Sequence, residues 1–553
     1  MRSPAPRALL ATASVAVALA AADTYVVVLA LTDMMAGVGL GIDSLQRATP
    51  IISGFLLGYI AVLPLIGRLA DLTERQRVLL ACLAIFVVGS TVTALAVELP
   101  VLVAGRVIQG VGGGGLVPAT LAIVAQLWDS DRRGTPLGVV GAVQELGSVL
   151  GPVLGAAVLA VADWRAIFWL NAILGVVLAA AVVAVGGGMP SRPRALPVGV
   201  SLLAAGVAWL ALAAPSALAT DLVLGVPFVP FGESSSRVAT PIGVVALLLV
   251  SAAAALWVRG SWAVLRRADL LGALLLGGAL GCVVLTFAAS DPEKEVVGPL
   301  GLALLPVAAV LAALYLLHHR RAAAPLVPRG VVVGRTRWSL LVSLCVGVAL
   351  VAVIVDVPLL ARLVHTESET VAAFVLVRFL VAVPVGALVG GWSLRRLGDG
   401  LVSGVGLALA AVGLVVMSTW GRGSLDEWSS TLVLALVGLG IGLALAPVNN
   451  AALADSPGDA HGTASALVVV ARMIGMVVGL ALLTAIGLHQ YYATVAALPD
   501  QTDSGALLDA AVVQVEYVFR GGAVAAAVGA VASLALGLTR RRALAVAPRP
   551  HHT

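Results

Sequence analysis

The chain has 553 residues, of which 60% are hydrophobic and only 11% are charged. A soluble globular domain carries about 25% charged residues, so this composition excludes a water-soluble fold. The formal net charge is +5, and the basic residues gather in loops, so no nucleic-acid partner is predicted. The three cysteines lie in separate apolar stretches and the seven histidines are scattered. No metal site and no cofactor are therefore predicted.

Apolar runs long enough to cross a bilayer recur along the whole chain. A transmembrane helix needs about 20 predominantly apolar residues, and lipid forces each backbone amide to bond within its own helix. We therefore predict an all-α polytopic membrane protein with about sixteen spans. The spans are expected at residues 8–31, 50–70, 78–97, 101–127, 136–161, 167–187, 198–216, 239–258, 269–289, 299–317, 338–360, 371–392, 400–420, 430–453, 463–486 and 520–539.

The first segment is similar to a secretory signal peptide, because it has arginines, an apolar core and small residues near Ala22. Its apolar run continues past Asp23 through "TYVVVLAL". We therefore predict a retained first helix.

The distribution of basic residues predicts the orientation of these spans. With the N-terminus in the cytoplasm and alternating loops, most of the 33 Lys and Arg residues fall on the cytoplasmic side, as expected for cytoplasmic loops. Clustered examples are Arg132, Arg133, Arg266, Arg267, Arg320, Arg321, Arg395, Arg396, Arg540, Arg541 and Arg542. We predict a multi-pass protein of the inner (plasma) membrane with both termini in the cytoplasm.

A weak internal repeat relates the two ends of the chain. A shift of 328 residues places "DRRGT" (131–135) on "DAHGT" (459–463), and Gly147 and Gly151 on Gly475 and Gly479. Transporters are often built from such repeats, with the substrate path between them; chance agreement in Gly-rich helices is the alternative. The predicted domains are a six-helix half at 1–190, an extra transmembrane hairpin at 191–267, a linker transmembrane hairpin at 268–337, and a second six-helix half at 338–553 with an extended outer segment at 487–519.

Three motifs lie in the first half: "GRLADLTERQR" (67–77) after the second span, "GRVIQGVGGGG" (105–115) in the fourth, and "GSVLGPVLG" (147–155) in the fifth. Closely spaced glycines let helices approach to backbone contact, and a proline inside a helix bends it. Ordinary Gly-rich packing is the alternative, but it does not explain Arg106 beside Gln109. A solvated basic loop likewise explains the arginines of the first motif but not Asp71. The motif residues are Gly67, Asp71 and Arg75, then Gln109 and Gly110, then Gly147, Gly151, Pro152 and Gly155.

Together with "ADTYVVVLAL" (22–31), these motifs resemble the major facilitator superfamily, and within it the drug:proton antiporters with fourteen spans. "DTYVVV", "QELGSVLGP" and "VVVARMIGM" (468–476) further resemble the actinobacterial exporters of triacylglycerol and lipophilic drugs. The resemblance implies two six-helix halves plus linker helices, a lipophilic substrate, protons as the second substrate, and a lipid-carrying lipoprotein partner on the outer side. Two features depart from this pattern: Glu74 replaces the second glycine of the loop motif, and the hairpin at 198–258 is additional.

Six ionisable groups lie inside predicted spans: Asp23, Arg106, Glu145, Asp356, Arg378 and Arg472. One such charge costs ~3 kcal/mol at the bilayer centre, so these groups are expected to face the interior and pair. From their depths, Asp23 and Arg106 are predicted to meet and to carry proton coupling. Glu145 and Arg472 lie at matching depths on repeat-related spans and are predicted to form a cavity gate or substrate contact. Asp356 and Arg378 lie near outer span ends, where static pairing is expected.

Three functions remain open at this stage. The first is proton-coupled export of lipids or lipophilic molecules, the second a narrower small-drug or metabolite antiporter, and the third a membrane-bound acyl- or glycosyltransferase. No catalytic residues are assigned, because the acidic clusters have no nearby histidine, and no phosphate-binding G-x-x-x-x-G-K-[ST] loop is present. The outer segment 487–519 is expected to guide a lipid or dock a partner, with a plain linker as the alternative.

Overall fold

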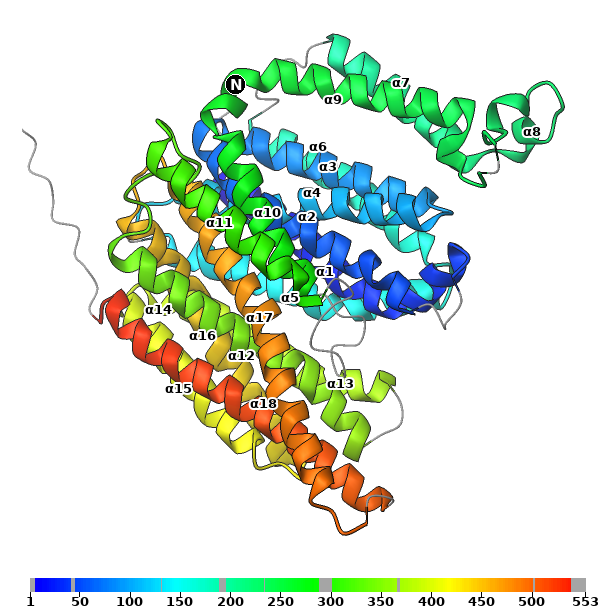
Figure 1. Ribbon diagram of the computed structural model, residues 1–553. Helices are drawn as coiled ribbons and strands as arrows, with labels where there is room; N and C mark the ends of the chain where they lie inside the picture. The colour runs from blue at the N-terminus through cyan, green and yellow to red at the C-terminus, as the bar shows by residue number, and fades with distance from the viewer. Residues whose placement is uncertain are drawn as a thin grey trace, which may run out of the picture. The chain divides into compact units, whose positions relative to one another are not determined.

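The computed structural model describes residues 5–40, 45–130, 132–187, 195–232, 234–287, 301–365, 369–500 and 503–538 (Figure 1). Within these ranges every regular element is helical, which confirms the predicted all-α class. Fifteen helices are long and apolar enough to cross a membrane, and a shorter apolar helix covers Leu270–Thr286. Adding the shorter helix to the fifteen gives the predicted number of about sixteen apolar segments.

The first half of the sequence contributes six long helices. They are α1 (Pro6–Gly37), α2 (Leu45–Leu72), α3 (Arg75–Leu95), α4 (Leu99–Leu127), α5 (Gly134–Leu159) and α6 (Arg165–Val185).

The middle of the chain forms two hairpins. The first holds α7 (Ala195–Ala213), α8 (Ser216–Ala219), η2 (Val226–Phe228), η3 (Arg237–Ala239) and α9 (Pro241–Arg267), and the second holds α10 (Leu270–Thr286), η4 (Gly301–Ala303) and α11 (Leu304–Arg321).

The last part of the chain is again a series of long helices. They are α12 (Gly334–Val364), α13 (Glu369–Leu380), α14 (Ala382–Ser393), α15 (Asp399–Met417), α16 (Trp428–Asp455), α17 (His461–Ala496) and α18 (Ser504–Ser533), followed by η5 (Leu534–Leu536).

Two predicted elements differ in detail from the structure. The predicted span 371–392 is divided at Val381 into α13 and α14, because Pro384 has no N–H to donate to the carbonyl of Leu380. The outer segment 487–519 is long for a connection. Its residues 505–519, "GALLDAAVVQVEYVF", are amphipathic and predict an extension of the last helix, which α18 confirms; the difference is that residues 487–496 are helical as well. The helix α17 continues to Ala496 and α18 begins at Ser504, so only residues 497–503 connect them.

The helices form two compact units. One contains residues 1–123, 146–331 and 458–470, and the other contains residues 124–145, 332–457 and 471–553. The helices α4, α5 and α17 are each divided between the units, so the units do not follow the boundaries of the predicted sequence halves. The four predicted domain ranges therefore stay a prediction.

Backbone-to-backbone packing in the first unit depends on the motif glycines. A Cβ placed on Gly151 would lie 2.5 Å from the carbonyl oxygen of Ala22, and one on Gly147 would lie 2.7 Å from the Cα of Ala18. Both glycines therefore hold α5 directly against the backbone of α1, and any larger residue must push these helices apart.

The extra hairpin packs α7 against α9 (Figure 1). Most of the surface of both helices is exposed, including Leu203, Trp209, Leu247 and Leu248, as expected for lipid-facing spans. The hairpin contacts the first half through the backbone N–H of Arg237, which donates at 2.5 Å to the carboxylate of Glu98 in the connection between α3 and α4.

Candidate functional site

A buried polar cluster surrounds Asp23 in the first unit. Arg106 Nη1 donates to Asp23 Oδ2 at 2.6 Å, and both residues are 1% exposed. Gln109 Nε2 and Asn171 Nδ2 donate to Asp23 Oδ1 at 2.9 and 2.5 Å. The Asp23 carboxylate on α1 is thus bound by side chains from α4 and α6, away from solvent.

The same cluster fixes the guanidinium of Arg106. Its Nη1 also donates to Gln109 Oε1 at 2.6 Å and its Nε to the Ile51 carbonyl at 3.3 Å. Its Cζ lies 4.4 Å from the centroid of the Phe55 ring, a cation–π contact that strengthens where water is excluded. Arg106 and Gln109 are three residues apart, so α4 presents both on one face.

The sequence predicted the meeting of Asp23 with Arg106, and the geometry confirms this contact. It did not identify Asn171, although an amide inside the apolar run "FWLNAIL" was the available signal. Proton coupling through the pair stays a prediction.

A second buried ion pair lies in the other unit. Arg472 Nη1 on α17 is 3.5 Å from Glu145 Oε1 on α5, and the two side chains are 10% and 9% exposed. A Cβ on Gly475 would lie 2.9 Å from the backbone carbon of Leu344, so α17 reaches this place in direct contact with α12. The pairing predicted from matched depths is present, and its function as a gate stays a prediction.

The motif at residues 67–77 begins in the last turns of α2 and binds the first turn of α17. Asp71 Oδ1 accepts the N–H of Gly462 at 2.6 Å, and Oδ2 accepts the N–H and the hydroxyl of Thr463 at 2.8 and 2.7 Å. The first N–H groups of a helix have no partner within the helix and carry partial positive charge, so they favour a carboxylate. We call this contact the α17 latch: Asp71 with Gly462 and Thr463.

Neighbouring motif residues support the latch. A Cβ on Gly67 would lie 2.6 Å from the Gly462 carbonyl oxygen, so only glycine allows this approach of α2 and α17. Arg75 Nη1 donates to the Ala122 carbonyl of α4 at 2.8 Å. Glu74, which departs from the family motif, makes an exposed ion pair with Arg77 at 3.2 Å and takes no part in these contacts.

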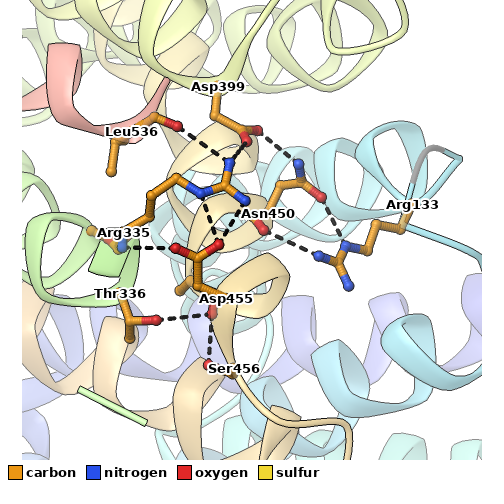
Figure 2. A network of polar contacts seen from close by, with 10 residues as sticks. Arg133, Arg335, Thr336, Asp399, Asn450, Asp455, Ser456 and Leu536 are labelled. Carbon is orange, nitrogen blue, oxygen red and sulfur yellow. Dashed lines mark hydrogen bonds and ion pairs between the residues drawn. The ribbon is translucent and has the colours of Figure 1, made fainter. Parts of the chain in front are cut away.

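Figure 2 shows a polar network in the second unit that the sequence did not predict. Arg133, from the connection between α4 and α5, donates through Nε to Asn450 Oδ1 at 2.8 Å and through Nη2 to the Asn450 carbonyl at 3.2 Å. The amide of Asn450 donates to Asp399 Oδ1 at 2.7 Å. Arg335 bridges Asp399 and Asp455 at 3.2 and 2.9 Å. The network joins this connection to α12, α15 and α16.

Arg133 is 3% exposed. Burial lowers the pKa of its guanidinium to about 10, and this effect exceeds the opposing attraction of Asp399. Arg133 therefore stays charged at neutral pH and needs the acceptors that Asn450 provides.

Comparison with known proteins decides the family. The model of the Major Facilitator Superfamily matches residues 13–293, half of the chain. The chain belongs to the Major Facilitator Superfamily. Its relatives include a triacylglyceride transporter of Mycolicibacterium smegmatis, 38% identical over 499 residues that cover 88% of this chain and 77% of the relative. A triacylglyceride transporter of Mycobacterium tuberculosis is 36% identical over 508 residues, 89% of this chain and 85% of the relative.

Solved structures agree on the fold. The human organic anion transporter MFSD10 covers 96% of this chain and 100% of its own, with a TM-score of 0.56 and 15% identity. At this identity the likeness shows the fold alone. The chain thus has the superfamily fold that its motifs implied.

The remaining predicted residues have the following places in this superfamily fold. Asp356 is buried on α12, and Arg378 Nη1 on α13 lies 3.4 Å from Ser430 Oγ and 3.5 Å from the Leu425 carbonyl. Gly110 and Gly155 lie on α4 and α5. Pro152 lies within α5, and its side chain is outside the described residues. Across the described ranges, no group of three or more His, Cys, Asp or Glu residues is arranged to hold a metal ion.

Proposed function

We propose that the chain exports triacylglycerol-like lipids or other lipophilic molecules by alternating access, and that protons drive the export. The observation that carries the substrate class is the similarity to relatives named triacylglyceride transporters along most of both chains. The buried Asp23–Arg106 cluster supports the coupling to protons, because ionisable groups inside membrane spans mark ion and proton pathways.

Asp23 is the group that binds and releases the proton in this proposal. The ionised carboxylate attracts Arg106 and accepts hydrogen bonds from three side chains. A proton on Asp23 removes the attraction to Arg106 and leaves the guanidinium less constrained. Protonation therefore changes the contacts among α1, α4 and α6, and differential contacts of this kind shift an equilibrium between two arrangements.

The α17 latch, the Arg133–Asn450 contact and the Glu145–Arg472 pair hold the cytoplasmic side closed in this proposal. Each contact joins helices from the two sequence halves: α2 with α17, the connection after α4 with α16, and α5 with α17. Opening inward separates each pair, and water then solvates the freed groups. Pairing in the closed arrangement offsets the cost of burying both charges of Glu145 and Arg472.

The location and partner follow from the same argument. We place the protein in the inner membrane with both termini in the cytoplasm, because the basic residues favour that orientation. The segment 487–519 contains the end of α17 and the start of α18 and lies on the outer side in this topology. Leu483 of α17 and Val518 of α18 share one buried cluster. The two helices provide a rigid surface for an emerging lipid or a lipid-carrying lipoprotein.

Transport into inside-out vesicles tests the proposal. A proton gradient should drive uptake of a radiolabelled triacylglycerol, and an uncoupler should abolish it. Asp23→Asn should abolish the driven uptake, whereas Asp33→Asn, an exposed position on the same helix, should retain it. Driven uptake by Asp23→Asn equal to that of the natural chain would refute coupling through Asp23.

A narrower drug or metabolite antiporter is the second function that this assay distinguishes. It would transport a small lipophilic cation under the same gradient and leave the triacylglycerol outside. Replacement of residues 492–512 by a short Gly/Ser linker separates the two further. The replacement should damage lipid transport more than drug transport if the extension handles lipid, and should damage both equally if it serves only as a connection.

A further inference from the structure

We propose that residues 322–331, which follow the linker hairpin and are called the strap here, hold the first turns of α17 in the closed position. Asp269 is the residue that positions the strap. The inference deepens the proposed function and rests on it only for the meaning of the closed position.

Asp269 connects three parts of the linker. Its Oδ1 accepts the N–H of Gly272 at 3.0 Å and caps α10, and it lies 2.7 Å from Nε2 of His318 on α11. Its Oδ2 accepts the N–H of Leu326, in the strap, at 2.9 Å. The residue is 9% exposed, so these partners replace the water that an isolated carboxylate needs.

The backbone of Asp269 is in a sparsely populated conformation. Its φ is +59°, in the left-handed region that residues other than glycine rarely adopt. Such conformations persist only where the surroundings over-determine them, and they cluster at functional sites. The carboxylate contacts with Gly272, His318 and Leu326 hold this conformation in place, and the last of them connects Asp269 to the strap.

The strap is stiff and is fixed at a second point. Pro325 and Pro328 restrict its φ angles. Arg329 Nη2 donates to the carbonyls of His319, Arg320 and Ala322 at 3.2, 2.9 and 3.0 Å. A cation on these last carbonyls of α11 is favourable, because a helix C-terminus carries partial negative charge.

The strap reaches α17 through apolar side chains. Val327 and Val331 form one buried cluster with Ala460 and Ala464, and Val331 and Ala464 are fully buried. Ala460 and Ala464 flank Gly462 and Thr463, the two residues that Asp71 binds. The first turns of α17 are therefore held by α2 through the latch and by the linker through the strap.

The linker is itself attached to α2. A Cβ on Gly277 of α10 would lie 2.8 Å from the carbonyl oxygen of Ala61, so the two helix backbones are in direct contact. The strap therefore connects α17 to α10, and α10 packs on α2. Release of the strap removes this indirect connection and favours separation of α17 from α2. This gives the linker hairpin a function in setting the balance between closed and open states.

Distances between spin labels measure that balance without transport. Cys82, Cys282 and Cys345 are first replaced by serine, and labels are placed at the exposed positions Arg77 and Asp459. Asp269→Gly removes the carboxylate and accepts the left-handed backbone, so backbone strain does not confound the result. We expect the ratio of open to closed populations to rise about tenfold, the size of one lost hydrogen bond to a charged group.

Three further variants complete the test. Asp503→Gly removes a comparable helix cap, at α18, and should leave the ratio within about twofold of the natural chain. Val331→Ala removes two methyl groups at the strap contact and should raise the ratio about threefold. The double variant of Asp269→Gly with Val331→Ala should show less than the product of the single effects, because both act through one strap.

Two results would overturn the inference. One is an unchanged ratio in both Asp269→Gly and Val331→Ala; the second variant is conservative enough to fold if the first is not. The other is full multiplication of the two effects. A chain that exports a different substrate would fail the lipid assay and still show the distance shift, so the two proposals fail separately.

Discussion

Removal of the Asp71 carboxylate should release the α17 latch. In Asp71→Ala, two backbone N–H groups and the hydroxyl of Thr463 lose their acceptor. A hydrogen bond to a charged group contributes about 1.5–3 kcal/mol to stability. Asp71 is only partly buried, and water satisfies the freed groups once the helices separate, so the three bonds are not fully additive. We expect the closed state to lose about 3 kcal/mol in total, roughly a hundredfold in the closed-to-open ratio.

The variant Asp71→Asn gives the intermediate case. Asparagine keeps one oxygen as an acceptor but loses the charge that favours a helix N-terminus. About half of the effect should remain, which is roughly a tenfold change in the ratio. The graded series separates the charge and the hydrogen bonds from a general loss of packing.

The label pair at Arg77 and Asp459 reports this equilibrium. Asp129→Ala is the matched control, because Asp129 is an exposed carboxylate in another loop between two spans. The control should leave the distance distribution unchanged. The latch argument is wrong if Asp71→Ala shows the same distribution as the natural chain, or if alanine and asparagine are indistinguishable.

Two other predictions test the remaining contacts, and a third tests the topology. Arg133→Met should raise the open population about tenfold in the same distance assay, because Asn450 loses its charged donor; an unchanged distribution would show that this contact does not hold the closed state. Glu145→Gln should lower transport, and the exchange Glu145→Arg with Arg472→Glu should recover part of it, whereas no recovery would argue against direct pairing. A cysteine at Ser235, exposed between η2 and η3, should react with an impermeant thiol reagent in intact cells, and labelling only after permeabilisation would reject the predicted topology.

The free-energy cost of burying a charged side chain made much of the site predictable from the sequence. Charges inside apolar spans must find partners, so helix depth alone predicted that Asp23 meets Arg106. The repeat predicted that Glu145 meets Arg472. The helical class and about sixteen apolar segments followed from span length and composition.

The missed features depend on neutral residues or on long-range contacts. Asn171 is an ordinary amide in sequence and becomes notable only because α6 places it 2.5 Å from Asp23. The sequence uses Arg133 only to predict orientation, because a basic loop residue favours the cytoplasmic side whether its side chain is solvated or buried. The strain at Asp269 cannot be predicted from an N-cap pattern, since the backbone angle depends on contacts from residues far along the chain.

The end of α14 packs like the end of α2, with different charges nearby: a Cβ on Gly67 would lie 2.6 Å from the Gly462 carbonyl oxygen, and one on Gly391 would lie 2.5 Å from that of Gly134. Gly67 and Gly391 are 324 residues apart, four fewer than the shift of 328 that relates α5 to α17, and the same shift of 324 places Asp71 on Arg395. Asp71 binds Thr463 at the start of α17, and Arg395 Nε donates to the hydroxyl of Thr135 at the start of α5 at 3.2 Å. The first is a carboxylate on a helix N-terminus, which the partial charges favour, and the second is a cation there, which they do not. The hydroxyl of Thr135 gives the cation an acceptor at an end that offers only donors.

The same shift places the basic residue Arg75 on the acidic residue Asp399. This exchange of charge explains why the network in Figure 2 has additional members. Arg75 reaches the Ala122 carbonyl near the C-terminal end of α4 directly, because a cation suits that end. Asp399 faces the equivalent end of α16, where carbonyl groups cannot donate to it. It binds the side-chain amide of Asn450 instead and recruits Arg335 as a counter-ion. In the second half the motif positions are kept while the charges are exchanged, and the additional partners are the physical consequence of that exchange.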